Sequence, residues 1–315
     1  MNTYSKYVIL IKIDGERDYE WKEVFSRTIP EFEIRIWPFI NDPSEIDFAL
    51  LWNPPEDLFK TIQKLKIIFS VGAGLDHLTQ CPTLPSKVPI IRMIDPSLKK
   101  GVIEYVLYHI LRIQRRMDDY TKLKLKKHWK RLDHQQSFEI CVGIMGVGEI
   151  GAAVGLNLVS LGYKVCGWSK TNKVFDGIDS YVGLSELPRF LASVNILIIV
   201  LPLTSATRNI INSDKLLMLP RGSHLINVGR GGLIIEDHLL ALIKSGHIAS
   251  AALDVFENEP LPESHEFWIN DNIFITPHIA GQTNPVTAVK FIISNIEKFK
   301  LGANMIGEVD LEDYR

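Results

Sequence analysis

The chain has 315 residues with 46% hydrophobic content, and its 35 basic residues nearly balance 37 acidic ones, a composition typical of globular proteins and not of disordered or fibrous chains. The formal net charge of -2 gives no electrostatic reason to expect a nucleic acid or a membrane surface as partner. No apolar run approaches the roughly 20 residues that cross a bilayer, and we expect no secretory signal at the N-terminus.

The three cysteines, Cys81, Cys141 and Cys166, are odd in number and show neither a paired nor a metal-binding spacing. Unpaired cysteines of this kind are typical of a reducing compartment. We therefore expect a cytoplasmic protein whose cysteines are structural.

Residues 1–97 are predicted to form a small α/β domain. Short apolar segments, expected as strands, lie at 7–13, 32–37, 48–52 and 66–70, and a helix is expected at 21–28. This alternation is typical of a parallel sheet that is covered on both faces. The last of these strands leads into Gly72-Ala73-Gly74.

The segment 102–120 has apolar residues at helical spacing and is predicted to be one long amphipathic helix. The locally basic stretch 122–131 is interpreted as a solvated surface.

Beyond it, strands and helices alternate in the order of a doubly wound sheet. Strands are expected at 140–145, 163–168, 196–200, 224–228, 251–255 and 273–276, and helices at 150–161, 184–194, 213–218 and 236–245. A final helix at 286–300 has no strand left to pair with and is expected to return to the first domain.

Three glycines, Gly146, Gly148 and Gly151, lie between an apolar strand and a helix of small residues. In this context the first permits a tight turn, the second lets the backbone approach a pyrophosphate, and the third lets helix and strand pack closely. The unpaired N–H groups and the dipole of the helix N-terminus bind phosphate. The sequence therefore predicts a dinucleotide site here.

The end of the next strand selects the cofactor, because an acidic residue there binds the ribose 2'-OH of NAD, whereas a nearby cation admits a 2'-phosphate. This chain has Ser169 and Lys170 at that place and no acidic residue before Asp176. NADP(H) is favoured, and NAD(H) stays open as the alternative.

Three late segments, 227–232, 254–260 and 276–281, each place charged residues at the end of an apolar strand, where an open α/β sheet binds its ligands. Together with the glycine turn, they resemble the D-isomer-specific 2-hydroxyacid dehydrogenase family, and most of all its NADPH-dependent glyoxylate/hydroxypyruvate reductases. The resemblance extends over nearly the whole chain.

The resemblance implies an α/β fold of two domains. A Rossmann-type doubly wound parallel sheet, residues 98–285, would bind the dinucleotide. It would be inserted in a smaller flavodoxin-like α/β substrate-binding domain made of residues 1–97 and 286–315.

The resemblance also implies reduction of a small 2-oxo acid by hydride transfer, and the side chains suit this chemistry. Arg230 is always charged and can hold the carboxylate and polarise the carbonyl. His278 is the expected general acid. Glu259 is expected to pair with His278 and keep it protonated. No metal is required.

Further site residues follow from the resemblance alone. Trp52 and the backbone N–H groups of Ala73 and Gly74 would bind the substrate, together with Arg230 and His278. Beside the three glycines, the cofactor would contact Glu149, Ile150, Ser169, Lys170, Leu201, Pro202, Thr207, Val228 and Asp254. Trp52 is equally interpreted as a core residue, because buried aromatic side chains are common.

One segment departs from the glyoxylate/hydroxypyruvate group, which tends to have an arginine before the proline that follows the catalytic histidine. Here the residues are Gln282-Thr283-Asn284-Pro285, so a second cation for the substrate is missing from this segment. The preferred 2-oxo acid therefore stays open.

Two alternatives remain. One is an NAD-dependent dehydrogenase acting on a D-2-hydroxy acid, and the other is a non-catalytic regulator that senses dinucleotides, because fold alone does not determine function. A homodimer is expected, since the 102–120 region forms an interface in relatives.

Overall fold

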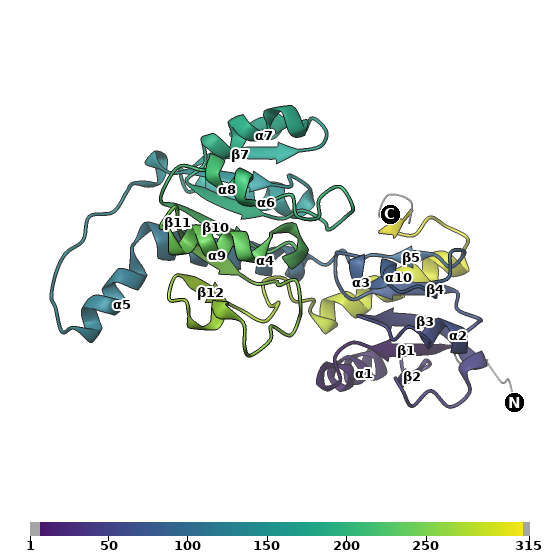
Figure 1. The fold of residues 1–315 in the computed structure, drawn as a ribbon. Helices are drawn as coiled ribbons and strands as arrows, with labels where there is room; N and C mark the ends of the chain where they lie inside the picture. Colours follow the sequence, from purple (N-terminus) through teal and green to yellow (C-terminus); the bar gives the residue numbers. More distant parts are fainter. Residues whose placement is uncertain (1–6, 311–315) are drawn as a thin grey trace, which may run out of the picture. The chain divides into compact units, whose positions relative to one another are not determined.

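The computed structural model describes residues 7–310, which divide into two compact units (Figure 1). Of these residues, 7–98 and 282–310 form the first unit, and Lys99–Gly281 forms the second. The sequence placed the two crossings at 97/98 and 285/286. Each unit is described by itself below.

The first unit contains a six-stranded sheet in the order β13-β5-β4-β3-β1-β2. Its strands are β1 (Val8–Lys12), β2 (Glu33–Ile36), β3 (Ile46–Leu51), β4 (Ile67–Ser70), β5 (Ile90–Ile91) and β13 (Glu308–Val309). All neighbours are parallel except β13, which pairs antiparallel with β5. The sequence missed β5 and β13, because a two-residue strand is too short to show a periodic pattern.

Both faces of this sheet are apolar because successive side chains of a strand point to opposite faces. Ile9 and Ile11 of β1 pack with Trp21 and Ile292 on one face, whereas Leu10 packs into a second cluster. The helices of this unit are α1 (Glu16–Thr28), α2 (Leu58–Thr61), α3 (Asp76–Thr79) and α10 (Pro285–Lys300). Helix α10 contacts α1, so the last helix belongs to the first unit.

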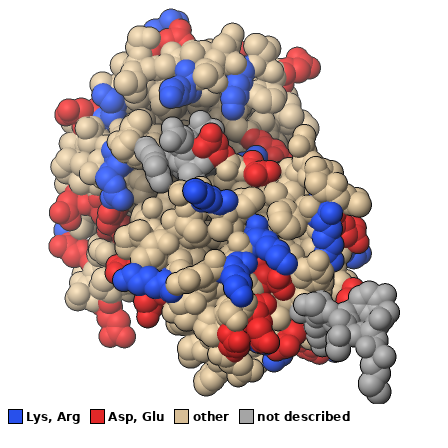
Figure 2. All heavy atoms as spheres, turned by 90° about the vertical axis from the view of Figure 1, so that its right-hand side faces the viewer, with Lys and Arg blue, Asp and Glu red and all other residues tan. Residues whose placement is uncertain are grey.

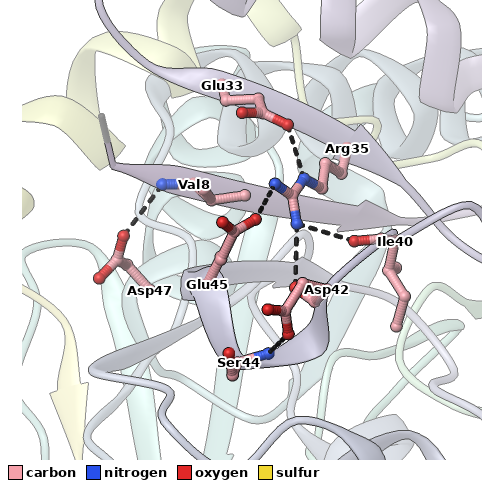
Figure 3. A network of polar contacts seen from close by, with 8 residues as sticks. All are labelled: Val8, Glu33, Arg35, Ile40, Asp42, Ser44, Glu45 and Asp47. Carbon is pink, nitrogen blue, oxygen red and sulfur yellow. Dashed lines mark hydrogen bonds and ion pairs between the residues drawn. The ribbon is translucent and has the colours of Figure 1, made fainter. Parts of the chain in front are cut away.

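A buried cation ties together the connection between β2 and β3 (Figure 3). The Arg35 side chain is only 7% exposed and forms ion pairs with Glu33 and Glu45. Its Nη1 also donates to the carbonyl oxygens of Ile40, at 2.8 Å, and Asp42, at 3.0 Å. A guanidinium so fully paired is structural, because a buried charge needs partners at nearly every donor.

The second unit is built on a seven-stranded parallel sheet in the order β12-β11-β10-β9-β6-β7-β8. Its strands are β6 (Cys141–Met145), β7 (Lys164–Ser169), β8 (Ile178–Val182), β9 (Ile196–Ile199), β10 (Ser223–Asn227), β11 (Ile248–Leu253) and β12 (Ile273–Ile275). This is the predicted Rossmann-type doubly wound arrangement, and the predicted fold class is confirmed. The sequence missed β8, a largely exposed edge strand that lacks an apolar pattern.

The helices of the second unit begin with α4 (Pro96–Gln114), which starts at the boundary, and α5 (Met117–Leu125). They continue with α6 (Glu149–Ser160), α7 (Gly183–Ala192), α8 (Ser213–Met218) and α9 (Glu236–Lys244). None of the helices described is long and apolar enough to cross a membrane.

The prediction of one helix over 102–120 was wrong. The chain leaves the helix at Arg116, whose φ of 55° is left-handed, and a second helix begins after it. The apolar spacing stops at Ile113, so nothing holds a continuing helix against the core. Ion pairs of Arg112 with Asp118 and of Arg116 with Asp119 close the turn instead.

The basic stretch 122–131 is almost entirely exposed, as the sequence predicted, although Trp129 within it is fully exposed as well. On the face shown in Figure 2, acidic and basic side chains are interspersed. The surface on that face thus reflects the near balance of charges in the sequence.

Candidate active site

The glycine turn joins β6 to α6, and its geometry requires glycine at two of the three positions. Gly146 has a φ of +106°, and a Cβ there would lie 2.7 Å from the Val200 carbonyl oxygen. A Cβ on Gly151 would lie 2.0 Å from the Gly146 oxygen. At Gly148, the N-cap of α6, a Cβ would meet nothing within 4 Å, so this side of the turn is open.

An open turn at the N-terminus of a 12-residue helix fits a pyrophosphate, because the first N–H groups of a helix have no partner within it. Glu149 and Ile150 follow in the first turn of α6. The Glu149 carboxylate is exposed and pairs with Lys99 at 2.9 Å. Since a carboxylate repels a phosphate, the group of Glu149 that could bind a phosphate is its backbone N–H.

Ser169 and Lys170 lie at the carboxyl end of β7. The Ser169 side chain is buried and its Oγ donates to the Thr171 carbonyl at 2.7 Å, which shapes the following turn. Lys170 is exposed. The structure thus places a buried hydroxyl and an exposed cation at the carboxyl end of β7, where the sequence predicted that the cofactor is selected.

The loops after β9 and β10 lie side by side. Thr207 Oγ1 donates to the Pro202 carbonyl at 2.7 Å and accepts from the Thr204 N–H at 2.8 Å, which closes the loop after β9. A Cβ on Gly229 would lie 2.9 Å from the Leu201 carbonyl. Leu201, Pro202, Thr207 and Val228 therefore border one edge of the sheet, the edge of the glycine turn.

The backbone around Arg230 is fixed by close packing. A Cβ on Gly231 would fall 1.8 Å from the Phe256 carbonyl carbon, so only glycine fits. The fully buried Asn227 accepts from the Gly229 N–H at 3.1 Å and donates to the Arg230 carbonyl at 2.9 Å. Asn227 is a supporting residue to which the sequence assigned no role.

His278 and Glu259 form a hydrogen-bonded pair, with 2.8 Å between Nδ1 and Oε2. Glu259 Oε1 also accepts from the Phe256 N–H at 3.0 Å. Burial by itself would raise the pKa of Glu259, but the hydrogen bond and charge of His278, the Phe256 N–H and the charge of Arg230 outweigh it and hold this pKa below its ordinary value. The second unit therefore brings the three predicted catalytic residues together.

The loop that carries His278 is held by Asp254, which is only 1% exposed. Its carboxylate accepts hydrogen bonds from Thr276 Oγ1 at 2.6 Å and from the N–H groups of Ile279 and Ala280, both at 2.8 Å. These bonds stabilise His278 at a left-handed φ of 55°. Burial raises the pKa of Asp254 despite these bonds.

Tyr105 of α4 extends this network. Its hydroxyl lies 2.7 Å from Thr276 Oγ1, whose own proton is donated to Asp254. Neither Tyr105 nor Thr276 was predicted as a site residue, because a partner 171 positions away leaves no local signal.

In the first unit, Trp52 and the loop 71–75 lie together. The Trp52 ring stacks on His77 with 4.0 Å between centroids, and a Cβ on Gly72 would lie 2.9 Å from its Cζ3. The backbone N–H groups of Ala73 and Gly74 donate to no other atom of residues 7–310. Trp52 is thus half-buried, and its ring packs both on His77 and against Gly72 of this loop.

The hydroxyl of Ser70, at the end of β4, organises the same loop. Its oxygen lies 2.9 Å from the Gly72 carbonyl and 3.2 Å from the Gly74 carbonyl, accepts from the Gly72 N–H, and lies 3.3 Å from His77 Nε2. Ser70 and His77 were missed by sequence reasoning, since both are buried polar residues without a motif.

Comparison with known proteins gives consistent results for sequence and structure. The family model described as "D-isomer specific 2-hydroxyacid dehydrogenase, NAD binding domain" matches residues 107–280. Glyoxylate/hydroxypyruvate reductase A of Serratia proteamaculans is 37% identical over 297 residues, covering 93% of this chain and 95% of that protein.

Within residues 7–310, no group of three or more His, Cys, Asp or Glu side chains is placed to hold a metal ion.

Two solved structures have nearly the same fold. A D-isomer specific 2-hydroxyacid dehydrogenase from Xanthobacter autotrophicus Py2, in complex with NADPH and MES, superposes with a TM-score of 0.91 at 35% identity, covering 98% of this chain and 100% of that one. The NADPH-dependent glyoxylate/hydroxypyruvate reductase from Sinorhizobium meliloti, in complex with NADP and sulfate, gives 0.91 at 32% identity, covering 97% and 98%.

Proposed function

The chain belongs to the D-isomer specific 2-hydroxyacid dehydrogenase family, as the resemblance predicted, and on this premise we propose that it reduces a small 2-oxo acid of the glyoxylate or hydroxypyruvate kind with NADPH. The observation that carries the proposal is the grouping of Arg230, Glu259 and His278 in one unit, with His278 and Glu259 paired at 2.8 Å. The glycine turn of the same sheet supplies the dinucleotide site.

The roles of the three side chains follow from their chemistry. Arg230 presents a permanent positive charge that holds the substrate and draws electron density from its carbonyl oxygen. His278 Nδ1 is engaged by Glu259, so the proton on Nε2 is the one passed to the developing alkoxide. Glu259 stays ionised and stabilises the protonated imidazole. The nicotinamide, when bound, supplies the hydride.

The two units divide the binding work. The first unit binds the substrate carboxylate through the backbone N–H groups of Ala73 and Gly74, with Trp52 beside them. The support for this assignment is that these two N–H groups have no partner among residues 7–310. Residues 99–281 bind the dinucleotide.

The cofactor is held along the carboxyl edge of the second sheet. Gly146, Gly148, Gly151 and the backbone of Glu149 and Ile150 hold the pyrophosphate, and Ser169 and Lys170 bind the 2'-phosphate that distinguishes NADP. Contacts along the rest of its length come from Leu201, Pro202, Thr207, Val228 and Asp254. The NADPH and NADP in the two solved relatives support NADP(H) over NAD(H).

Absorbance of the reduced nicotinamide tests the function directly. We expect NADPH to be consumed with glyoxylate and hydroxypyruvate, and NADH to be consumed more slowly. His278→Ala is expected to lower kcat by about 100-fold or more, and Arg230→Ala to impair both kcat and KM. Rates near those of the wild type in both variants would contradict the assignment. Tight cofactor binding without turnover would favour the dinucleotide-sensing alternative.

A homodimer and a cytoplasmic location are the remaining parts of the proposal. The dimer is supported by large apolar side chains that lie exposed on and after α4, among them Tyr108, Leu111 and Trp129. The location is supported by three cysteines that are all free thiols. Light scattering of the purified chain measures its mass in solution. The mass of two copies would support the dimer, and the mass of one copy would contradict it.

A further inference from the structure

Two cationic side chains, Lys12 and Arg17, lie where β1 of the first unit leads into α1. They differ in how many of their N–H donors form hydrogen bonds within the protein. Lys12 Nζ donates to the Trp52 carbonyl at 3.0 Å and to the Ile13 carbonyl at 3.2 Å, and burial lowers its pKa although Asp18 and Asp14 oppose this. The ammonium group of Lys12 is therefore committed to the protein backbone.

Arg17, in the first turn of α1, is half-buried and much less committed. Its Nη2 donates to the Thr283 carbonyl at 3.1 Å, and this is the single hydrogen bond of its guanidinium with residues 7–310. No carboxylate of those residues lies within ion-pair distance of it. A guanidinium has five N–H donors, so most of the binding capacity of Arg17 remains available.

The partner of Arg17 connects it to the loop proposed to bind substrate. Thr283 is buried, and its Oγ1 donates to the carbonyl of Val71 at 2.6 Å, the residue that begins the loop 71–75. The segment is anchored by Asp95, which accepts from the Asn284 N–H at 3.3 Å and from Thr287 Oγ1 at 2.9 Å. The chain of contacts from Arg17 through Thr283 to Val71 thus holds a cation beside this loop.

We propose that Arg17 is a specificity-determining residue that binds a second carboxylate on the 2-oxo acid, and that 2-oxo dicarboxylic acids are accordingly among the substrates. This rests on the proposed function. The loop N–H groups take the carboxylate next to the carbonyl, whereas the remaining donors of Arg17 form charge-assisted bonds with the distal one. Monocarboxylic acids leave these donors in water.

Oxaloacetate and pyruvate provide the matched test, because they differ only in the second carboxylate. In Arg17→Gln we expect KM for oxaloacetate to rise by about tenfold or more, as for the loss of a hydrogen bond between charged groups, with kcat for both acids unchanged and KM for pyruvate unchanged. Arg17→Lys should retain part of the affinity. Arg27→Gln, on the same helix but exposed and paired with Glu23, should behave as the wild type.

The outcomes separate this inference from the proposed function. Equal changes for both acids in Arg17→Gln, or no change for either, would contradict the role of Arg17 while leaving reduction of 2-oxo acids intact. Failure of the wild type to consume NADPH with any 2-oxo acid contradicts the proposed function and this role with it. Thermal denaturation of Arg17→Gln checks the fold, and loss of stabilisation by oxaloacetate in the same measurement is the expected binding result.

Discussion

Two loops at the carboxyl ends of strands, one in each unit, are held in opposite ways. In the first unit, the Ser70 hydroxyl lies against the carbonyls of Gly72 and Gly74. In the second, the Asp254 carboxylate accepts from the N–H groups of Ile279 and Ala280. The Ser70 hydroxyl thus interacts mainly with carbonyl oxygens of its loop, whereas the Asp254 carboxylate accepts hydrogen bonds from N–H groups of its loop.

This difference determines what each loop presents. With its carbonyls engaged, the loop 71–75 keeps the N–H groups of Ala73 and Gly74 unpaired within residues 7–310, which suits an anion. The loop 276–281 has its N–H groups bound and offers instead a side chain, His278, at a strained φ of 55°. One loop therefore presents its backbone N–H groups, and the other presents an imidazole.

Of the three substitutions that test this difference between the loops, removal of the Asp254 carboxylate should have the largest effect on stability and activity. In Asp254→Ala, two buried N–H groups and the Thr276 hydroxyl lose their acceptor, at a cost of about 1–3 kcal/mol for each group, and His278 loses its fixed position. We expect a clear fall in Tm and a decrease in kcat of about 100-fold. Thermal denaturation and steady-state kinetics measure both, and an unchanged kcat would show that the loop holds His278 without Asp254.

Replacing Glu259 should affect the chemistry of the imidazole and leave the loop in place. Because the pKa of Glu259 is lowered, its ionised carboxylate stabilises the pair with His278 fully when the pH is above the ordinary carboxyl pKa. This stabilisation is lost as the pH falls through the lowered pKa of Glu259. In Glu259→Gln the alkaline limb of the pH profile of kcat should move down by about one unit, with about tenfold less activity on that limb. An unmoved limb would contradict the role of Glu259.

Removing the Ser70 hydroxyl should have the smallest effect and a different signature. In Ser70→Ala the loop 71–75 loses one anchor worth about 1 kcal/mol, so KM should rise about fivefold while kcat is retained. Ser223→Ala is the matched control, because Ser223 is also buried and donates to the carbonyls of Val194 and Pro220 away from both loops. An equal rise of KM in the control would mean that stability, not loop position, is being measured.

Much of the fold could be predicted because its signals are local. Apolar strands ending in glycine or charged residues mark the parallel sheet, and the turn from Gly146 to Gly151 carries its packing constraints in the sequence itself. The break at Arg116 and the edge strand β8 were missed, since the first depends on ion pairs within a polar turn and the second has no apolar pattern.

The site was predicted in part for the same reason. Arg230, Glu259 and His278 occur in recognisable segments, and the structure brings them together. The residues that hold these three in place do not occur in recognisable segments. Tyr105, Asn227 and the loop-anchoring function of Asp254 depend on partners from other strands and helices, which no motif records.

The central claim is hydride transfer to the carbonyl carbon of a 2-oxo acid, and isotope transfer tests it most directly. The enzyme would be supplied with NADPH deuterated at C4 of the nicotinamide and with glyoxylate or hydroxypyruvate, and the product examined by NMR. We predict one deuterium at C2 of the 2-hydroxy acid, formed much more slowly by His278→Ala. A product without deuterium at C2, or no product from any 2-oxo acid offered, would contradict the claim.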